Sequence, residues 1–314
     1  MVAISGAEAV RERSAPTVVA RRRRKFNLGN AVAYVILTGW MLFTLFPVAW
    51  LLMSSVKEPQ DVFAMPPQWV FTPTLHNYEV VLGLTIPTEL ETVTETTAGT
   101  GMSPFPRFLA NTVLVAVGTT VLALGLGSAA AYALTRFYPR QRNGLLIGVM
   151  ITRLVPPVVL IIPIYVIWRN FDLLDTHFGL ILAYLTFALP FVIWMMRGFL
   201  LDIPVELEEA AMIDGASRLQ ALTRVVLPLA APGLAATAIF VILLAWNDFF
   251  YALILTSGNA RTVTPYIGGF ITDKAILWGR LYASSAIIML PVLIFGLAVQ
   301  KQLAHGLTGG AVKG

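Results

Sequence analysis

The chain contains no cysteine, and only 12% of its 314 residues are charged. Without cysteine there can be no disulfide, no thiolate metal ligand and no cysteine nucleophile. The three histidines stand apart from one another, without the spacing of a metal site. The sequence also lacks the loop Gly-x-x-x-x-Gly-Lys followed by Ser or Thr that cradles the phosphates of ATP. We therefore predict no metal site, no catalytic residues and no ATP hydrolysis by this chain itself.

Long apolar runs accompany the low charge. Hydrophobic residues make up 57% of the chain, and the charged fraction is well below the roughly 25% that is usual in soluble domains. A helix needs about 20 predominantly apolar residues to span a bilayer. Six runs meet that length, at residues 31–53, 108–135, 145–168, 178–200, 231–256 and 282–300. The predicted fold class is therefore an all-α membrane protein with six transmembrane helices.

Basic residues indicate the orientation of these helices. Six spans place both ends of the chain on one side, and 15 of the 22 lysine and arginine residues fall on that side, with six on the other. Because cytoplasmic loops carry the excess of Lys and Arg, both termini are predicted to be cytoplasmic. The net charge of +5 therefore reports membrane orientation, and no nucleic-acid partner is predicted.

The spans divide the chain into three predicted parts: a basic N-terminal tail at residues 1–30, a transmembrane domain at 31–304 and a C-terminal tail at 305–314. The domain has one long external segment, 54–107, and one long inner loop, 202–230. The external stretch 85–103 is either mobile or in contact with a partner, and the sequence leaves this open.

The inner loop has the pattern of two short helices joined at a glycine. Its first part places acidic residues, among them Glu208 and Glu209, near the N-terminus of a helix, where the helix dipole favours negative charge. Gly215 suits the left-handed position that ends such a helix. A second helix is predicted from about Ser217, and Pro228 is predicted to stop it.

The second helix has an apolar face, predicted to be formed by Leu219, Leu222 and Val226. The loop is then either an amphipathic surface element between two spans or an element that docks into another protein. Its polar face has too few basic residues for a lipid-binding helix. Ala210 and Ala211 would allow close approach of a protein partner.

The same loop resembles a known motif. Glu209-Ala210-Ala211, Gly215 after three residues, and Val225-x-Leu227-Pro228 after nine more are similar to the EAA loop of ABC importer permeases, with Val225 where isoleucine is more usual. In that family the loop is the coupling helix, which enters a cleft of the ATPase subunit. The resemblance implies ATPase coupling for Glu208, Glu209, Ala210, Ala211, Asp214, Gly215, Leu227 and Pro228.

Other stretches resemble the carbohydrate-uptake branch of this family. They are Asn111-Thr112, residues 127–132, Pro156-Pro157, residues 162–165, residues 246–249 and the C-terminal stretch 306–314. Within residues 246–249, Asp248 stands where the branch more often has glutamate. The pattern resembles the shorter of two unlike permease subunits, the counterpart of the maltose system's inner partner.

Three polar residues inside the predicted spans are candidates for a functional role. Arg153 lies about nine residues into the third span, and Asn247 and Asp248 lie in the fifth. An ionisable residue within a span is a functional hypothesis by default, so we predict that all three lie on the translocation path. For Arg153 the alternatives are a structural ion pair or a side chain that reaches toward the membrane surface.

The resemblance implies an ATP-driven, binding-protein-dependent importer of a sugar or polyol in the bacterial inner membrane, with alternating access coupled through residues 209–215. The expected partners are a second permease subunit, a dimer of ATPase subunits that carries ATP and Mg, an external solute-binding protein at the outer segments 54–107 and 257–280, and membrane lipid. No cofactor is expected on this chain. The open alternatives are the same transporter carrying a phosphorylated glycerol or another polar solute, a secondary transporter, and a membrane-embedded enzyme. The sequence names neither the solute nor whether this subunit touches it.

Overall fold

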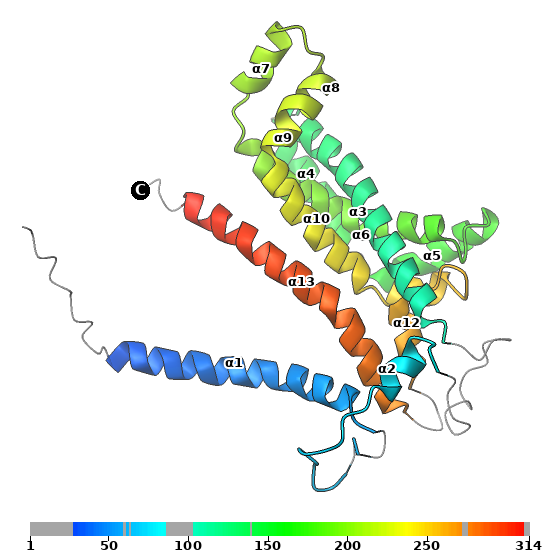
Figure 1. The fold of residues 1–314 in the computed structure, drawn as a ribbon. Coiled ribbons are helices and arrows are strands. Elements are labelled where there is room, and N and C mark those ends of the chain that lie inside the picture. The colour runs from blue at the N-terminus through cyan, green and yellow to red at the C-terminus, as the bar shows by residue number, and fades with distance from the viewer. Residues whose placement is uncertain are drawn as a thin grey trace, which may run out of the picture. The chain divides into compact units, whose positions relative to one another are not determined.

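The computed structural model describes residues 28–58, 61–62, 64–85, 103–138, 140–271 and 276–310. Most of the predicted N-terminal tail and of the external stretch 85–103 lies outside these residues, as do the last four residues of the chain. Regular structure in the described residues is helical, apart from one isolated antiparallel bridge between Ile271 and Ile276. The chain divides into two compact parts, Met1–Ala49 and Trp50–Gly314 (Figure 1).

The predicted all-α membrane fold is confirmed. Four helices are long and apolar enough to cross a membrane: α1 (Leu28–Ser55), α3 (Phe105–Arg136), α6 (His177–Leu201) and α13 (Trp278–Gly310). Two pairs of helices pass the same test together but are bent, by 85° between residues 143–154 and 157–170 and by 80° between residues 218–229 and 231–246. Counting each bent pair as one span gives up to six membrane segments in the part of the chain that the structure describes.

The other helical elements are shorter. They are α2 (His76–Val81), α4 (Arg142–Ile151), a 3-10 turn (Thr152–Leu154), α5 (Pro157–Asn170), α7 (Glu206–Ile213), α8 (Arg218–Ala221), a π-helical turn (Leu222–Val226), α9 (Leu227–Leu229), α10 (Ala231–Trp246), α11 (Phe250–Leu255) and α12 (Val263–Gly268). The long α13 continues to Gly310, so the predicted start of the C-terminal tail at residue 305 falls inside a helix.

The prediction of an unbroken span at 145–168 is wrong, because the chain bends between α4 and α5. After the 3-10 turn, Val155 is extended with ψ 119°, and Pro156 is extended with ψ 137°. A proline pushes the residue before it out of helical backbone, and here two prolines, Pro156 and Pro157, follow one another. The second proline then begins α5, at a position where its missing N–H is not needed.

The predicted span at 231–256 is also interrupted, between α10 and α11. The side-chain amide of Asn247 donates to the Leu243 carbonyl over 2.7 Å at the end of α10, where the same carbonyl also accepts from the Asn247 backbone N–H over 3.2 Å. A carboxylate oxygen of Asp248 accepts from the Ala252 N–H over 3.1 Å at the start of α11. The interruption is therefore capped by its own polar side chains, as backbone at membrane depth requires.

The helices α3 and α6 pack closely against each other. A Cβ at Gly127 of α3 would lie 2.6 Å from the Val192 side chain of α6, and a Cβ at Gly118 would lie 2.6 Å from Ile181. Small residues at Gly127 and Gly118 therefore let the two helices approach closely. The apolar core around this contact also includes residues of the inner loop: its buried members are Ala123, Ala131, Tyr132, Leu185, Ala188, Val192, Met196, Leu200, Leu222, Val226, Ala230 and Val241.

Buried polar side chains fix the described part of the external segment. Lys57 is only 1% exposed, its ammonium donates to the Gln68 carbonyl over 2.6 Å, and it lies 4.8 Å from the centre of the Phe71 ring. Asn77 of α2 donates to the carbonyls of Ser55 and Lys57. Such contacts replace the water that a buried cation loses. The chain that follows α1 is thus folded against its own backbone.

We expect Gly127→Leu to destabilise the protein and Gly125→Leu to leave it stable. The side chain at residue 127 would enter the α3–α6 contact, where overpacking costs about 1–3 kcal/mol, whereas a Cβ at Gly125 meets no atom within 4 Å. The measurement is the midpoint of thermal unfolding of the purified chain in mild detergent. Equal midpoints for the two variants would contradict the assigned helix contact.

Candidate functional site

The inner loop forms the predicted elbow of two short helices. At the end of α7 the Gly215 N–H bonds to the Met212 carbonyl over 3.1 Å, and the Ala216 N–H bonds to the Ala211 carbonyl over 3.0 Å. Gly215 has φ +91°, a left-handed conformation that glycine adopts without a steric clash. The prediction that Gly215 ends the first helix is confirmed.

The second arm begins at Ser217 as predicted, but its apolar face is smaller. Ser217 and Gln220 form a capping box, in which each side chain accepts a hydrogen bond from the other residue's backbone N–H. Leu222 and Val226 are buried, whereas Leu219 is 69% exposed, so the prediction that Leu219 shares their face is wrong. The spacing rule assumes a continuous α-helix, but α8 passes into a π-helical turn at Leu222.

Pro228 does not stop the second arm, contrary to prediction. It is the second residue of α9, where the missing N–H of proline leaves no partner unsatisfied. The chain bends after this helix instead, before α10 begins. Leu227 is half-buried against the core of α3 and α6, and Pro228 is exposed.

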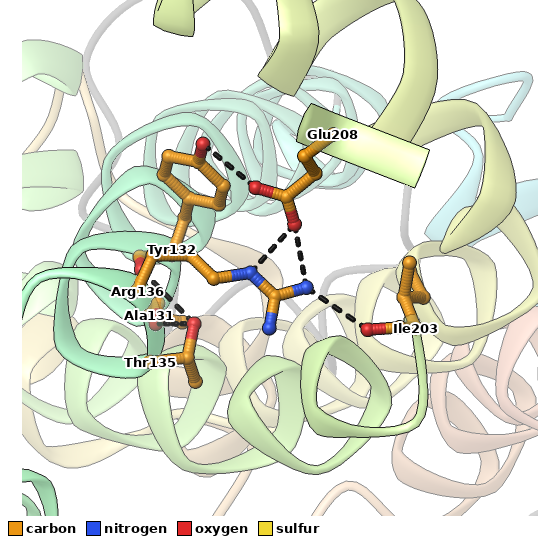
Figure 2. Close-up of polar contacts among 6 residues, drawn as sticks. All are labelled: Ala131, Tyr132, Thr135, Arg136, Ile203 and Glu208. Carbon is orange, nitrogen blue, oxygen red and sulfur yellow. Dashed lines mark hydrogen bonds and ion pairs between the residues drawn. The ribbon is translucent and has the colours of Figure 1, made fainter. Parts of the chain in front are cut away.

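Glu208 connects the first arm of the elbow to the end of α3, as Figure 2 shows. Arg136, in the last turn of α3, donates to one carboxylate oxygen of Glu208 from Nε at 2.6 Å and from Nη2 at 2.5 Å. The Tyr132 hydroxyl donates to the other oxygen over 3.0 Å. Nη2 of Arg136 also donates to the Ile203 carbonyl over 3.0 Å. We call Tyr132, Arg136 and Glu208 the inner clamp.

Burial makes the ion pair of the inner clamp costly to break. Glu208 is 2% exposed, and the Arg136 side chain is 12% exposed. Removing one partner of a buried ion pair leaves the other charge unpaired, at a cost of about 3–5 kcal/mol. Glu208 therefore faces its own chain, and its role in ATPase coupling stays a prediction.

Most of the other predicted coupling residues face outward. Exposed members are Glu209, Ala210, Asp214, Gly215 and Pro228, while Ala211 and Leu227 are half-buried. Ile213 adds apolar surface beside them, at 86% exposed. An exposed mixture of acidic, small and apolar side chains on a short helix suits docking of another protein.

Sequence reasoning missed Arg136 and Tyr132 as functional residues. In the sequence, Arg136 is one of the basic residues that indicate orientation, and Tyr132 belongs to the stretch 127–132 that resembles the carbohydrate-uptake branch. Arg136 and Glu208 lie 72 residues apart in the chain, so no local spacing connects them. The available signal was a basic residue at the end of one span and an acidic cluster in a loop on the same predicted side.

The three residues predicted on the translocation path lie around one cavity. Arg153, Asn247 and Asp248 line a space of about 580 Å³, together with Pro157, Phe187, Phe240, Leu243, Leu244, Phe249, Phe250 and Tyr251. Both helix interruptions, after α4 and after α10, contribute to its wall. Their role on a path stays a prediction, but the fold brings them together from two distant segments.

Arg153 lies at the bend between α4 and α5. Its guanidinium carbon is 5.5 Å from the centre of the Phe191 ring on α6, a cation–π contact. The residue is exposed and forms no ion pair with any residue that the structure describes. The alternative of a structural ion pair at Arg153 is therefore not supported.

At the other end of α3, polar side chains hold the turn that follows α11. Asp175, in the connection between α5 and α6, accepts hydrogen bonds from four consecutive backbone N–H groups of residues 257–260, over 2.8–3.2 Å. Asp175 has φ +54°, a left-handed conformation that Asp tolerates better than most residues. Its own N–H bonds to the Leu255 carbonyl over 2.9 Å.

The N-terminal part of α3 binds the same turn. Asn111 donates to the carbonyls of Asn259 and Arg261 over 2.8 and 2.9 Å, and its own carbonyl oxygen lies 2.8 Å from His177 Nε2. The Thr112 hydroxyl accepts from the Val263 N–H over 2.9 Å. We call Asn111, Thr112 and Asp175, with the turn 257–263, the outer knot.

The outer knot has a charged centre. Burial alone would raise the pKa of Asp175, but the backbone N–H groups of Asn259, Gly258, Ala260 and Ser257 outweigh it, so the pKa lies below its ordinary value of 3.8. Four N–H groups directed at one carboxylate stabilise the ionised form. The turn is therefore held by a carboxylate that stays ionised over the whole physiological range.

We expect Asp175→Asn to destabilise the protein by about 1–3 kcal/mol at neutral pH, because several charge-assisted hydrogen bonds are lost. Because the pKa of Asp175 is lower in the folded state, its carboxylate adds to the free energy of unfolding. This contribution is complete above the ordinary pKa of an Asp carboxyl and is lost as the pH falls through the lower, folded-state pKa. The gap in unfolding midpoint between wild type and variant should thus be constant from about pH 8 to 5 and shrink only in stronger acid.

Asp172→Asn is the matched control, since Asp172 lies in the same connection with φ +53° and is exposed. It should leave the midpoint unchanged. A gap for Asp175→Asn that narrowed already between pH 7 and about 5 would contradict the lowered pKa.

Comparison with known proteins places the chain in a family. Residues 122–309 match the family of the binding-protein-dependent transport system inner membrane component. The chain is 34% identical over 286 residues to the diacetylchitobiose uptake system permease protein DasC of Streptomyces coelicolor, covering 91% of this chain and 96% of that protein. It is 41% identical over 215 residues to the trehalose transport system permease protein SugB of Mycobacterium tuberculosis, covering 67% and 78%.

A solved structure has the same fold. It is a chain from the crystal structure of a bacterial ABC transporter involved in the import of the acidic polysaccharide alginate, with a TM-score of 0.65 and 24% identity, covering 87% of this chain and 96% of that chain. On the family match and these identities, the chain belongs to the inner membrane components of binding-protein-dependent transport systems.

Proposed function

We propose that this chain is the membrane-spanning permease subunit of an ATP-driven importer of a sugar or polyol. Its family supplies the membrane and binding-protein-dependent parts of this function. The observation that carries the ATP-driven part is the elbow at residues 206–229, which is held to α3 by the inner clamp on one side and exposed on the other. ATP and Mg are assigned to a dimeric ATPase partner that docks on the exposed side.

The cavity around Arg153 supports a polar, ring-shaped solute. Aromatic side chains line the space, among them Phe240 and the 43% exposed Phe249, and Asn247 and Asp248 offer hydrogen-bonding groups beside them. A small number of polar groups on an otherwise apolar wall is the usual composition of a small-molecule site. The printed names of two relatives, a diacetylchitobiose and a trehalose permease, support a sugar.

A phosphorylated or otherwise anionic solute is the second candidate. Arg153 is exposed at the cavity and pairs with an aromatic ring rather than with an acid. A guanidinium binds phosphate and carboxylate oxygens with two parallel hydrogen bonds. The test on Arg153 below separates the two candidates.

The assembly that we propose contains two permease subunits, two ATPase subunits and an external solute-binding protein that contacts the segments 54–107 and 257–280. In this arrangement both termini are cytoplasmic, in the bacterial inner membrane. The excess of basic residues on the side of the termini supports this orientation. The ordered backbone around Lys57 and around Asp175 supports preformed outer surfaces.

The first experiment is mass spectrometry of proteins that copurify with this chain in mild detergent. Recovery of a second permease and of an ATPase with a phosphate-binding loop is expected. Recovery of the chain alone, with solute uptake into liposomes in the absence of ATP, would replace the proposal with a secondary transporter.

Gly215→Val should uncouple ATP hydrolysis from uptake, whereas Gly215→Asn should largely preserve coupling. No atom lies within 4 Å of a Cβ at this position, so the only strain is the left-handed backbone, which costs about 1–2 kcal/mol for most residues and less for Asn. The measurement is solute imported per ATP hydrolysed in proteoliposomes. Equal ratios for both variants and wild type would show that the turn geometry is irrelevant to coupling.

Arg153→Ala should change the affinity or the selectivity of uptake, measured by competition within a panel of neutral and phosphorylated sugars. Loss of binding only for phosphorylated compounds would favour the anionic candidate. Arg169→Ala is the control, since Arg169 is exposed in the last turn of α5 and does not line the cavity. A lower protein yield with unchanged selectivity would assign Arg153 to folding alone.

A further inference from the structure

We infer that α3 transmits conformational change between the elbow, which faces the ATPase, and the outer turn 257–263. The inner clamp connects the C-terminal end of α3 to the elbow, and the outer knot connects its N-terminal end to the turn. The inference rests on the proposed function. It adds a positioning role for Tyr132, Arg136, Asn111 and Thr112, none of which touches the ATPase in the proposed arrangement.

The inner clamp is the main contact between the first arm of the elbow and the membrane spans. Glu208 is the one buried residue of α7, so this helix meets the spans through its carboxylate. Both partners of that carboxylate, Tyr132 and Arg136, lie on the last turns of α3. A push on the exposed face of α7 is therefore delivered to α3 as well as to the two spans that continue the chain.

The second arm is fastened to the same helix. Leu222 and Val226 belong to the core that contains Tyr132 and Ala131 of α3. The elbow thus has a polar contact with α3 on one arm and shares an apolar core with α3 and α6 on the other. These two connections make the elbow and the inner end of α3 move together.

The outer end of α3 is bound to the turn by directional hydrogen bonds. Asn111 and Thr112 bind three backbone groups of residues 259–263, and the side chain of Arg107 donates to the Asn259 side chain over 3.0 Å. Phe105 and Phe108 of α3 pack in one core with Val263 and Tyr266 of α12. A displacement of this end of α3 therefore displaces the turn.

Between its two ends α3 is a single unbroken helix of 32 residues without proline in its interior. At 1.5 Å per residue it is about 48 Å long, enough to cross a bilayer with its ends outside the hydrocarbon region. Figure 1 shows α3 extending from the neighbourhood of α12 to that of α9. Of the other helical routes between the two ends, α4–α5 and α10–α11 are interrupted and α6 contains Pro190 in its interior, so α3 is the connection with neither a break nor an internal proline.

The test uses the complete importer, copurified with its ATPase and placed in lipid nanodiscs. Ser257→Cys puts the only thiol of this chain on the outer turn, since the chain has no cysteine; the Ser257 side chain is exposed and only its backbone N–H binds Asp175. The rate of reaction with a membrane-impermeant maleimide is measured without nucleotide and after ATP with vanadate.

We expect the labelling rate to change by about fivefold or more on addition of ATP with vanadate, the lower range of a typical coupling. Glu208→Gln, which removes the charge that Arg136 binds, should abolish this change while the ATPase still copurifies. The exchanged pair Arg136→Glu with Glu208→Arg should restore it. Glu206→Gln, on an exposed acid of the same helix, should behave as wild type.

Thr112→Val provides the test from the outer end, because it removes the acceptor of the Val263 N–H with little change of volume. It should abolish the response with the inner clamp intact. A full response in Glu208→Gln or in Thr112→Val, or no response in the unmodified complex, would overturn the role of α3. If no ATPase copurifies with the unmodified chain, the proposed function itself fails.

Discussion

The close contact of α3 with α6 is the constraint on which the other features depend. It requires glycine at residue 127, because any side chain there would meet Val192 and push the helices apart. The core built on this contact contains Tyr132 of the inner clamp and Leu222 and Val226 of the elbow. Packing between two spans thereby fixes the position of a loop outside them, since dense cores transmit small displacements rather than absorbing them.

The two helix interruptions, after α4 and after α10, both place polar groups at the cavity. Backbone groups at membrane depth must find partners within the protein, and Asn247 and Asp248 supply them where α10 ends and α11 begins. The same two side chains line the cavity with Arg153. Asn247 and Asp248 can therefore both cap the helix ends and contact a solute. A break in a helix exposes polar backbone and side-chain groups, and a polar cavity forms only where such groups are present.

The sequence predicted what local physics determines. Apolar length located the membrane helices, the conformational freedom of glycine placed the end of α7 at Gly215, and Ser217 began the second arm. The bend at Pro156-Pro157 was visible in the residues, but apolar length alone gave a continuous span there. Leu219 was placed wrongly because helical periodicity was extended through a π-helical turn.

Contacts between distant segments could not be predicted in this way. Asp175 binds a turn more than 80 residues further along the chain, and Arg136 binds a residue 72 positions away. Nothing in the spacing of either residue distinguishes it from the other charged residues near span ends. The close-up in Figure 2 shows why: α3 and α7 have to come together before the carboxylate of Glu208 has its partners.

The neighbouring acids Glu208 and Glu209 show how one short motif serves two purposes. Successive residues of a helix point about 100° apart, so one of the two faces the spans and the other faces outward. A surface ion pair contributes about 0–1 kcal/mol, whereas breaking a buried one costs about 3–5 kcal/mol. If α7 had only the outward acid, a partner could bind it without moving the membrane helices. A short helix held only by its two ends would shift by itself. The inward acid, Glu208, connects the elbow to α3, so that a force applied at the outward surface reaches the membrane helices.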